Sequence, residues 1–235
     1  MYEHDGAAAT NAASGDQLAG VENARGVFAL EKADVLLAID SDLFGSDGDT
    51  VKNARLFAEG RRSEQAESTT MNRLYSVETT FSVTGAMADN RLRLRSDLIG
   101  PFLLRIAMEL GIDGLGTASH SFGSDQETVD KWVKAVAADL TEASGRSLVC
   151  VGGRQPAAVH ALALRINAHL GNIGADKPLR FVSTAGTPGF RPMSELYDSL
   201  LAGSVKQLIV IGGNPVTTVP GTIGFGGLMG RTGMS

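Results

Sequence analysis

The sequence has a single cysteine, Cys150, among its 235 residues. One thiol cannot form a disulfide within the chain, and it cannot supply a thiolate zinc site or a cysteine-ligated iron–sulfur cluster. Cys150 lies in a short apolar run, which predicts a buried core thiol rather than a reactive one. We therefore predict that this chain carries no metal site and no redox cofactor of its own.

The sequence also lacks long hydrophobic runs and an excess of basic charge. Its apolar stretches are far shorter than the roughly 20 residues that a membrane helix needs, so we expect no direct membrane insertion. The 21 basic and 26 acidic residues interleave and give a net charge of −5, which disfavours nucleic acid as a partner. Residues 1–20 contain acidic side chains and no apolar core, so they do not form a signal-peptide pattern.

The common catalytic motifs are missing as well. No stretch matches a P-loop, a dinucleotide fingerprint, a nucleophile elbow or a paired-histidine zinc motif. His160 and His169 are nine positions apart on a predicted helix, so they point to opposite sides and cannot share a metal. No catalytic residue is therefore predicted.

An acidic loop follows the first predicted strand and invites a comparison with calcium sites. The spacing fails, because Phe44 stands where an EF-hand loop needs an oxygen ligand. Asp and Ser are also the residues that helix caps and turns prefer. We therefore expect capping and turn chemistry from the four carboxylates of this loop, Asp40, Asp42, Asp47 and Asp49.

Residues 147–174 carry the clearest local pattern. A short apolar run from Leu148 to Val151 predicts a strand, and Gly152 and Gly153 allow the chain to turn. Pro156 then suits a helix start, and apolar residues at three- and four-residue spacing follow until Gly171. A buried strand followed by a helix with one apolar face is the repeating unit of a parallel α/β sheet.

Three further apolar segments predict strands of the same kind, residues 33–40, 74–78 and 205–211. Each runs into Gly, Asp, Asn or Ser, as expected at the carboxyl edge where open parallel sheets bind ligands. The predicted fold class is α/β, with a doubly wound, mostly parallel, Rossmann-like sheet and helices on both faces. We expect neighbouring parallel strands to contain Val35, Val77, Val149 and Ile209.

Arg91, Arg93 and Arg95 alternate with leucines, which predicts a half-exposed strand. Two interpretations remain open for these arginines. In the first, they clamp a phosphate or a carboxylate. In the second, they form a solvated edge with Asp89 and Asp97 as local partners.

Composition divides the chain into three parts. Residues 1–26 are expected to be a poorly packed lead-in, and residues 27–220 hold the α/β pattern. Residues 221–235 form a glycine-rich tail with no periodicity, so no structure is predicted there. A short edge strand is also expected at residues 179–183.

Taken together in order and spacing, four segments resemble the molybdopterin oxidoreductase superfamily. The likeness covers about residues 32–220 and is nearest to a noncatalytic branch, the iron–sulfur and molybdopterin-like B subunit of alternative complex III, a bacterial quinol-oxidising membrane complex. The segments are KADVLLAIDSDLFGSD, MNRLYSVETTFSVTGAMADNRLRLR, VGGRQPAAVHALALRINAHLGNIG and LIVIGGNPVTTVP.

The resemblance implies a set of cofactor-facing positions. In the superfamily, the loops that match two stretches of this sequence approach the pterin nucleotide of molybdopterin guanine dinucleotide. The resemblance therefore places vestigial cofactor-binding positions at Gly152, Gly153, Gly212, Gly213, Asn214 and Pro215. The cysteine motif and the metal ligand of the catalytic members do not occur in this sequence, so the resemblance implies no cofactor bound by this chain.

The function that the resemblance implies is structural. The chain would be an α/β domain of a subunit in a quinol:electron-acceptor oxidoreductase of the respiratory chain, not catalytic by itself. Its partners would be the remainder of its own subunit and other subunits of the membrane-bound complex, at the periplasmic face of the cytoplasmic membrane. Because family members are several times longer, the sequence is expected to be a fragment.

Two alternatives come from different classes. The first is a fragment of a catalytic oxidoreductase that binds two molybdopterin guanine dinucleotides. The second is a stand-alone nucleotide-binding α/β protein with the same sheet topology.

Overall fold

The computed structural model describes residue 2 and residues 10–61, 71–116, 120–184, 191 and 193–230. The chain divides into two compact units, residues 9–185 and a smaller unit made of residues 1–8 and 186–235. The domain predicted over residues 27–220 therefore extends over parts of both units.

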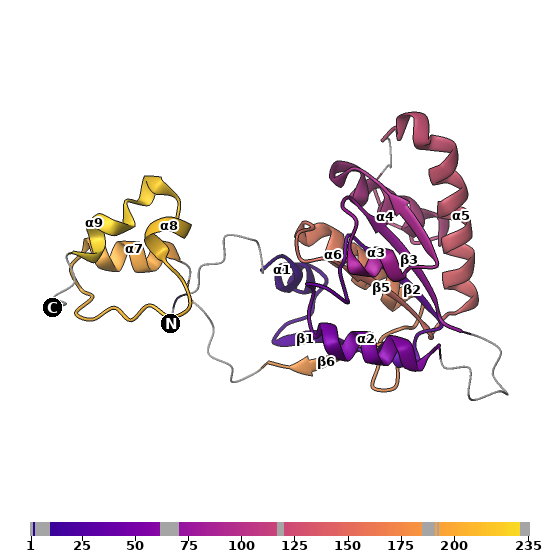
Figure 1. Cartoon of the computed structure of the whole chain (residues 1–235), viewed down its shortest axis with the longest axis horizontal. Coiled ribbons are helices and arrows are strands. Elements are labelled where there is room, and N and C mark those ends of the chain that lie inside the picture. The colour runs from indigo at the N-terminus through magenta and orange to yellow at the C-terminus, as the bar shows by residue number, and fades with distance from the viewer. Residues whose placement is uncertain are drawn as a thin grey trace. The chain divides into compact units, whose positions relative to one another are not determined.

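The larger unit is built on a four-stranded, all-parallel sheet (Figure 1). Its strand order is β4-β3-β2-β5, with β2 and β3 at the centre. The strands are β2 (Val35–Ile39), β3 (Arg73–Glu78), β4 (Asn90–Arg93) and β5 (Ser147–Val151). Val35, Val77 and Val149 lie in neighbouring parallel strands as predicted, and the α/β, Rossmann-like fold class is confirmed.

Helices cover both faces of this sheet. On one face, Leu37 and Val149 pack with α4 (Ser96–Glu109) and α5 (Gln126–Glu142). On the other, Leu36 and Leu148 pack with α2 (Thr50–Glu59) and a short 3-10 turn, η1 (Leu30–Lys32). Helix α6 (Ala157–His169) follows β5 and contributes to both cores. Because successive side chains of a strand point to opposite faces, the residues of each strand divide between the two cores.

Shorter elements complete the larger unit. Helix α3 (Val83–Met87) lies between β3 and β4, and the 3-10 turn η2 (Gly123–Asp125) precedes α5. A separate antiparallel ribbon is formed by β1 (Ala24–Phe28) and β6 (Leu179–Ser183), the latter at the predicted edge strand. None of the helices in the described ranges is long and apolar enough to cross a membrane.

The prediction that residues 1–26 pack poorly is wrong for residues 10–26, which the structure describes. Residues 11–18 form helix α1 (Asn11–Leu18), which packs against α6. At their contact, a Cβ on Gly15 would lie 2.4 Å from the Cβ of His160, so only glycine allows this close approach. Contact with α6 fixes the position of this segment. The sequence pattern of α1 by itself does not reveal that contact.

The smaller unit has its own small core. It contains α7 (Met193–Leu201), α8 (Pro215–Thr218), the 3-10 turn η3 (Gly221–Ile223) and α9 (Phe225–Met229). Leu196 and Leu200 of α7 pack with Phe225 and Leu228 of α9. The expectation of no structure after residue 220 is thus wrong for residues 221–229, because two apolar side chains at helical spacing find a partner helix. Residues 231–235 lie outside the described part.

The predicted strand at residues 205–211 is also wrong. The segment is irregular, and Ile209 and Ile211 are 81% and 90% exposed. The side-chain amide of Asn167 already bonds both the N–H and the C=O of Val149 on the outer side of β5. A further strand beside β5 would need these same backbone groups.

Candidate functional site

The order of the sheet reverses between β2 and β5, and open α/β sheets bind ligands outside the carboxyl ends of such strands. Asp40, directly after β2, has a left-handed backbone with φ 47°. Its carboxylate accepts hydrogen bonds from Thr79 N at 3.2 Å and from Gln155 Nε2 at 2.9 Å. One side chain therefore ties together the loops after β2, β3 and β5.

Gly152 closes the same crevice from the β5 side. Its N–H donates to the carbonyl of Ile39 at 2.9 Å, and a Cβ at this position would lie 1.9 Å from the carbonyl oxygen of Asp40. The glycine is therefore required for backbone-to-backbone packing rather than for room beside a ligand. Gly153, in contrast, would place a Cβ in open space, with nothing within 4 Å.

The other predicted cofactor-binding positions lie in the smaller unit. Gly212 and Gly213 would each place a Cβ in open space, and Asn214 Oδ1 accepts from Val216 N at 3.1 Å to cap α8, which begins at Pro215. Neither compact unit by itself holds the whole predicted set. Within the larger unit, Gly152 packs on the Asp40 backbone, so only Gly153 of that predicted pair has open space on its Cβ side.

The acidic loop after β2 uses its carboxylates within the protein. Asp42 Oδ1 accepts from Thr84 N and from Thr84 Oγ1, both at 3.0 Å. Asp47 Oδ2 accepts from Asp42 N at 2.8 Å and from Ser41 Oγ at 3.2 Å. The expected turn chemistry is confirmed for Asp47, whereas Asp42 makes a tertiary contact with α3, 42 residues away. Asp49 stands at the N-cap of α2 without a side-chain cap bond.

The alternating arginines do not converge. Arg91 pairs with the buried carboxylate of Glu78, at the end of β3, and lies 4.7 Å from the ring centroid of Phe81. Arg95 pairs with Asp97 at 2.7 Å, as the solvated-edge interpretation predicted. The phosphate or carboxylate clamp is therefore wrong for this set.

The predicted partner Asp89 instead pairs with Arg61. Within the described ranges, Arg93 has no ion pair. The same part of the chain holds no group of three or more His, Cys, Asp or Glu side chains arranged for a metal ion.

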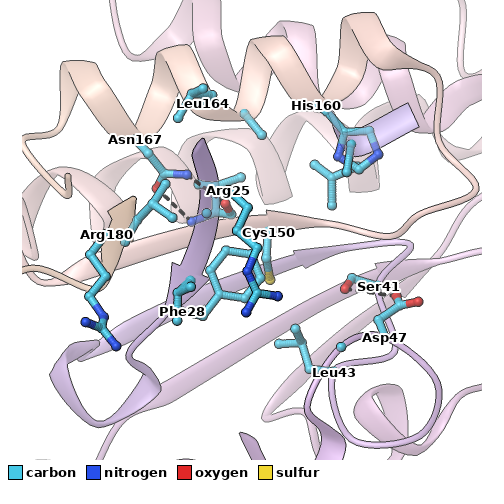
Figure 2. A pocket seen from close by; sticks show the side chains of 18 of the residues that line it. Arg25, Phe28, Ser41, Leu43, Asp47, Cys150, His160, Leu164, Asn167 and Arg180 are labelled. Carbon is cyan, nitrogen blue, oxygen red and sulfur yellow. Dashed lines mark hydrogen bonds between the residues drawn. The ribbon is translucent and has the colours of Figure 1, made fainter. Parts of the chain in front are cut away.

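A cavity of about 580 Å³ lies beside this edge, between the β1–β6 ribbon and the sheet (Figure 2). Helices α1 and α6 and the loop from β2 to α2 supply its remaining walls. Its lining is partly apolar and partly charged. The charged side chains and the histidine of the lining are Asp16, Arg25, Asp47, Asp49, Lys52, His160 and Arg180.

Burial shifts the pKa of several lining groups. The Cys150 thiol, 1% exposed, has a pKa raised to about 12 because its thiolate would lose water. Burial lowers the pKa of His160, since imidazolium is the charged form, although nearby backbone groups and Asp47 act in the opposite direction. Burial also raises the pKa of Asp16.

The sequence predicts the state of one residue that lines the cavity and does not identify two others. The prediction of a buried core thiol is confirmed for Cys150, whose Sγ lies 3.5 Å from the carbonyl oxygen of Leu37. Arg25 and Arg180 were not recognised as site residues, because their strands pair outside the main sheet. The β1 segment, Ala24–Phe28, has five residues and no clear polar–apolar alternation, so it gives too weak a signal to identify such a ribbon.

A scan against protein-family models finds no match to the chain, and a search of curated proteins finds none either.

Proposed function

We propose that this chain is a structural α/β domain of a molybdopterin-oxidoreductase-like subunit, of the kind found in alternative complex III. Its role is to pack against the remainder of its subunit and against neighbouring subunits of a respiratory complex. The order and spacing of the resembling segments support this proposal. Two of them supply β2, β3 and β4, which lie side by side in the sheet, and a third supplies helix α6.

One observation carries the noncatalytic part of the proposal. At the carboxyl ends of β2 and β5, where related folds bind nucleotides, the loops that follow the strands are bonded to one another. Gly152 packs onto the backbone of Asp40, and the Asp40 carboxylate bonds Gln155. A domain that uses this edge for its own stability is suited to a structural role.

The cysteine content supports the absence of a redox centre in this chain. Iron–sulfur clusters need several thiolate ligands, and Cys150 is the only cysteine. Its thiol lies in the core beneath the cavity and has a raised pKa, which disfavours the thiolate form that binds metal. Electron transfer would then belong to the partner polypeptides.

The direct test is chemical analysis of the purified chain. Iron, acid-labile sulfide, molybdenum and oxidised pterin are measured after expression in a host that makes the molybdopterin cofactor. The proposal predicts each of them far below one equivalent per chain. Stoichiometric iron and sulfide, or stoichiometric pterin, would overturn it. A cysteine motif and a metal ligand encoded beside this sequence would favour the catalytic alternative instead.

A further inference from the structure

The cavity beneath the β1–β6 ribbon has the size and composition of a ligand site. Its volume of about 580 Å³ lies within the range of roughly 300–1,000 Å³ that is usual for small-molecule pockets. It lies beside the contact between Asp40 and Gly152, since the adjacent residues Ser41 and Val151 line it. The cavity therefore needs an explanation of its own.

Its floor is apolar. Side chains from the ribbon, from the loop after β2 and from α6 meet there, and three of them are at least nine-tenths buried. These apolar side chains are Phe28, Leu43, Leu164, Leu179 and Phe181. Such a surface suits a flat or branched hydrocarbon body, because covering it removes apolar area from water.

The cations of the cavity make no ion pair with any residue that the structure describes. Within residues 10–61, 71–116 and 120–184, neither Arg25 on β1 nor Lys52 on α2 makes an ion pair, and Arg180 on β6 makes none. Figure 2 shows the Arg25 side chain leaving β1 and reaching toward the loop of Ser41 and Asp47, while the Arg180 guanidinium points away from that loop. Arg25 is exposed and leaves the ribbon on the face opposite Phe28, so its guanidinium lies at the rim of the cavity, beside the apolar floor.

The acidic groups of the lining do not neutralise Arg25. Asp47 already accepts hydrogen bonds from Ser41 Oγ and Asp42 N. Asp49 is exposed to solvent, and within the described ranges neither Asp49 nor Asp16 forms an ion pair with Arg25. An unpaired guanidinium presents a planar fork of N–H donors that matches a carboxylate, a sulfonate or a phosphate.

We propose that this cavity binds a small organic anion with an apolar body. The Arg25 guanidinium takes the charged group, Lys52 adds positive charge from α2, and the apolar body lies on Phe28, Leu43 and Leu164. This site is independent of the structural role proposed above, so either can hold without the other.

The test uses a pair of matched fluorescent probes and the full chain. The anion 8-anilinonaphthalene-1-sulfonate and the uncharged N-phenyl-1-naphthylamine share an apolar body and differ in the sulfonate. We expect the anion to bind at one equivalent. Arg25→Ala should weaken its binding about tenfold or more while changing binding of the neutral probe less than twofold. Arg93→Ala is the control, since it removes an equal charge that no ion pair holds and that lies outside the cavity.

The outcomes are distinct. Equal weakening by Arg25→Ala and Arg93→Ala, or failure of the anion to saturate at one equivalent, would overturn the proposal. Circular dichroism and the Trp132 fluorescence of each variant establish that it is folded. If Arg25→Ala is unfolded, Lys52→Ala replaces it and should weaken the anion about threefold or more. An unchanged affinity for that folded variant would also count against the site.

Discussion

The side chain of Asn167 pairs with the backbone of Val149 as a neighbouring strand would. Its Nδ2 donates to the Val149 carbonyl at 2.7 Å, and its Oδ1 accepts from the Val149 N–H at 3.0 Å. Asn172 continues the arrangement, because its Oδ1 accepts from Ser147 N at 3.3 Å. Unpaired strand edges promote aggregation, so these two amides close an otherwise open side of β5.

Replacing Asn167 should therefore destabilise the protein. Asn167→Ala leaves a buried N–H and a buried C=O of Val149 without partners, at a cost of about 2–4 kcal/mol in the free energy of unfolding. Urea denaturation followed by Trp132 fluorescence measures the change. Asn90→Ala, at an exposed position of β4, is the control and should change stability by less than about 0.5 kcal/mol. Similar stability for both variants would contradict the edge-closing role.

The two adjacent glycines should respond oppositely to alanine. Gly152→Ala places a Cβ 1.9 Å from the Asp40 carbonyl oxygen and should cost about 3 kcal/mol, because backbone must move to relieve the overlap. Gly153→Ala meets nothing within 4 Å and should range from neutral to about 0.5 kcal/mol stabilising. Thermal and urea unfolding measure both. A Gly152→Ala variant as stable as the parent would show that the contact between Gly152 and the Asp40 backbone is not required for stability, and would weaken the proposed structural role.

The Cys150 thiol should be inert in the folded protein. With a pKa of about 12, only about one thiol in ten thousand is ionised at pH 8. Ellman's reagent at pH 8 should therefore label far less than one equivalent in buffer and one equivalent in denaturant. A raised folded pKa also means that this group contributes stability at neutral pH, and that the contribution is lost as the pH rises above the unfolded value of about 8.5. Fast labelling without denaturant would contradict the burial.

His160 should make stability depend on pH in the acid range. Because burial lowers its pKa in the folded state, its neutral form contributes stability above the unfolded value of about 6.5, and the contribution is lost as the pH falls through the folded pKa. Its buried Nε2 has no hydrogen-bond partner among the residues that the structure describes. His160→Gln keeps the Cβ that packs on Gly15 and should show a smaller loss of stability between pH 7.5 and pH 5.

His169 provides the control for that experiment, since it is exposed and lies on the same helix. His169→Gln should retain the pH dependence of the parent. If both variants follow the parent curve, His160 does not contribute to acid sensitivity, and the carboxylates must account for it. Chemical denaturation at each pH, analysed with a common slope, gives the comparison.

The central strands could be predicted because their signal is local. Residues 33–40 and 74–78 are apolar runs that end in polar turn residues, and such runs become buried strands when helices cover both faces. The same holds for Ser147–Val151, followed by glycines and a periodic helix. The turn chemistry of Asp47 also followed from residue type, since short carboxylates bond nearby backbone N–H groups. The bond from Thr84 to Asp42 did not, because the two residues are 42 positions apart.

The failures come from partners that lie far away in the sequence. Residues 205–211 have strand-forming composition, but a strand also needs a free neighbour, and Asn167 occupies the outer side of β5. Helix α1 is nearly unpatterned and depends on the fit of Gly15 against His160, 145 positions later by residue number. The cavity was missed for the same reason, because α1, β1, β6 and α6 assemble it only in three dimensions.

The shielded thiol of Cys150 makes this chain a convenient host for site-specific labels. Because the native cysteine is inaccessible, an engineered surface cysteine becomes the sole reactive handle without removal of the original. Arg93→Cys would attach a spin label or dye to β4, and a second cysteine in place of Asp198 on α7 would carry its counterpart. Pulsed dipolar spectroscopy or energy transfer could then measure the separation of the two compact units in solution.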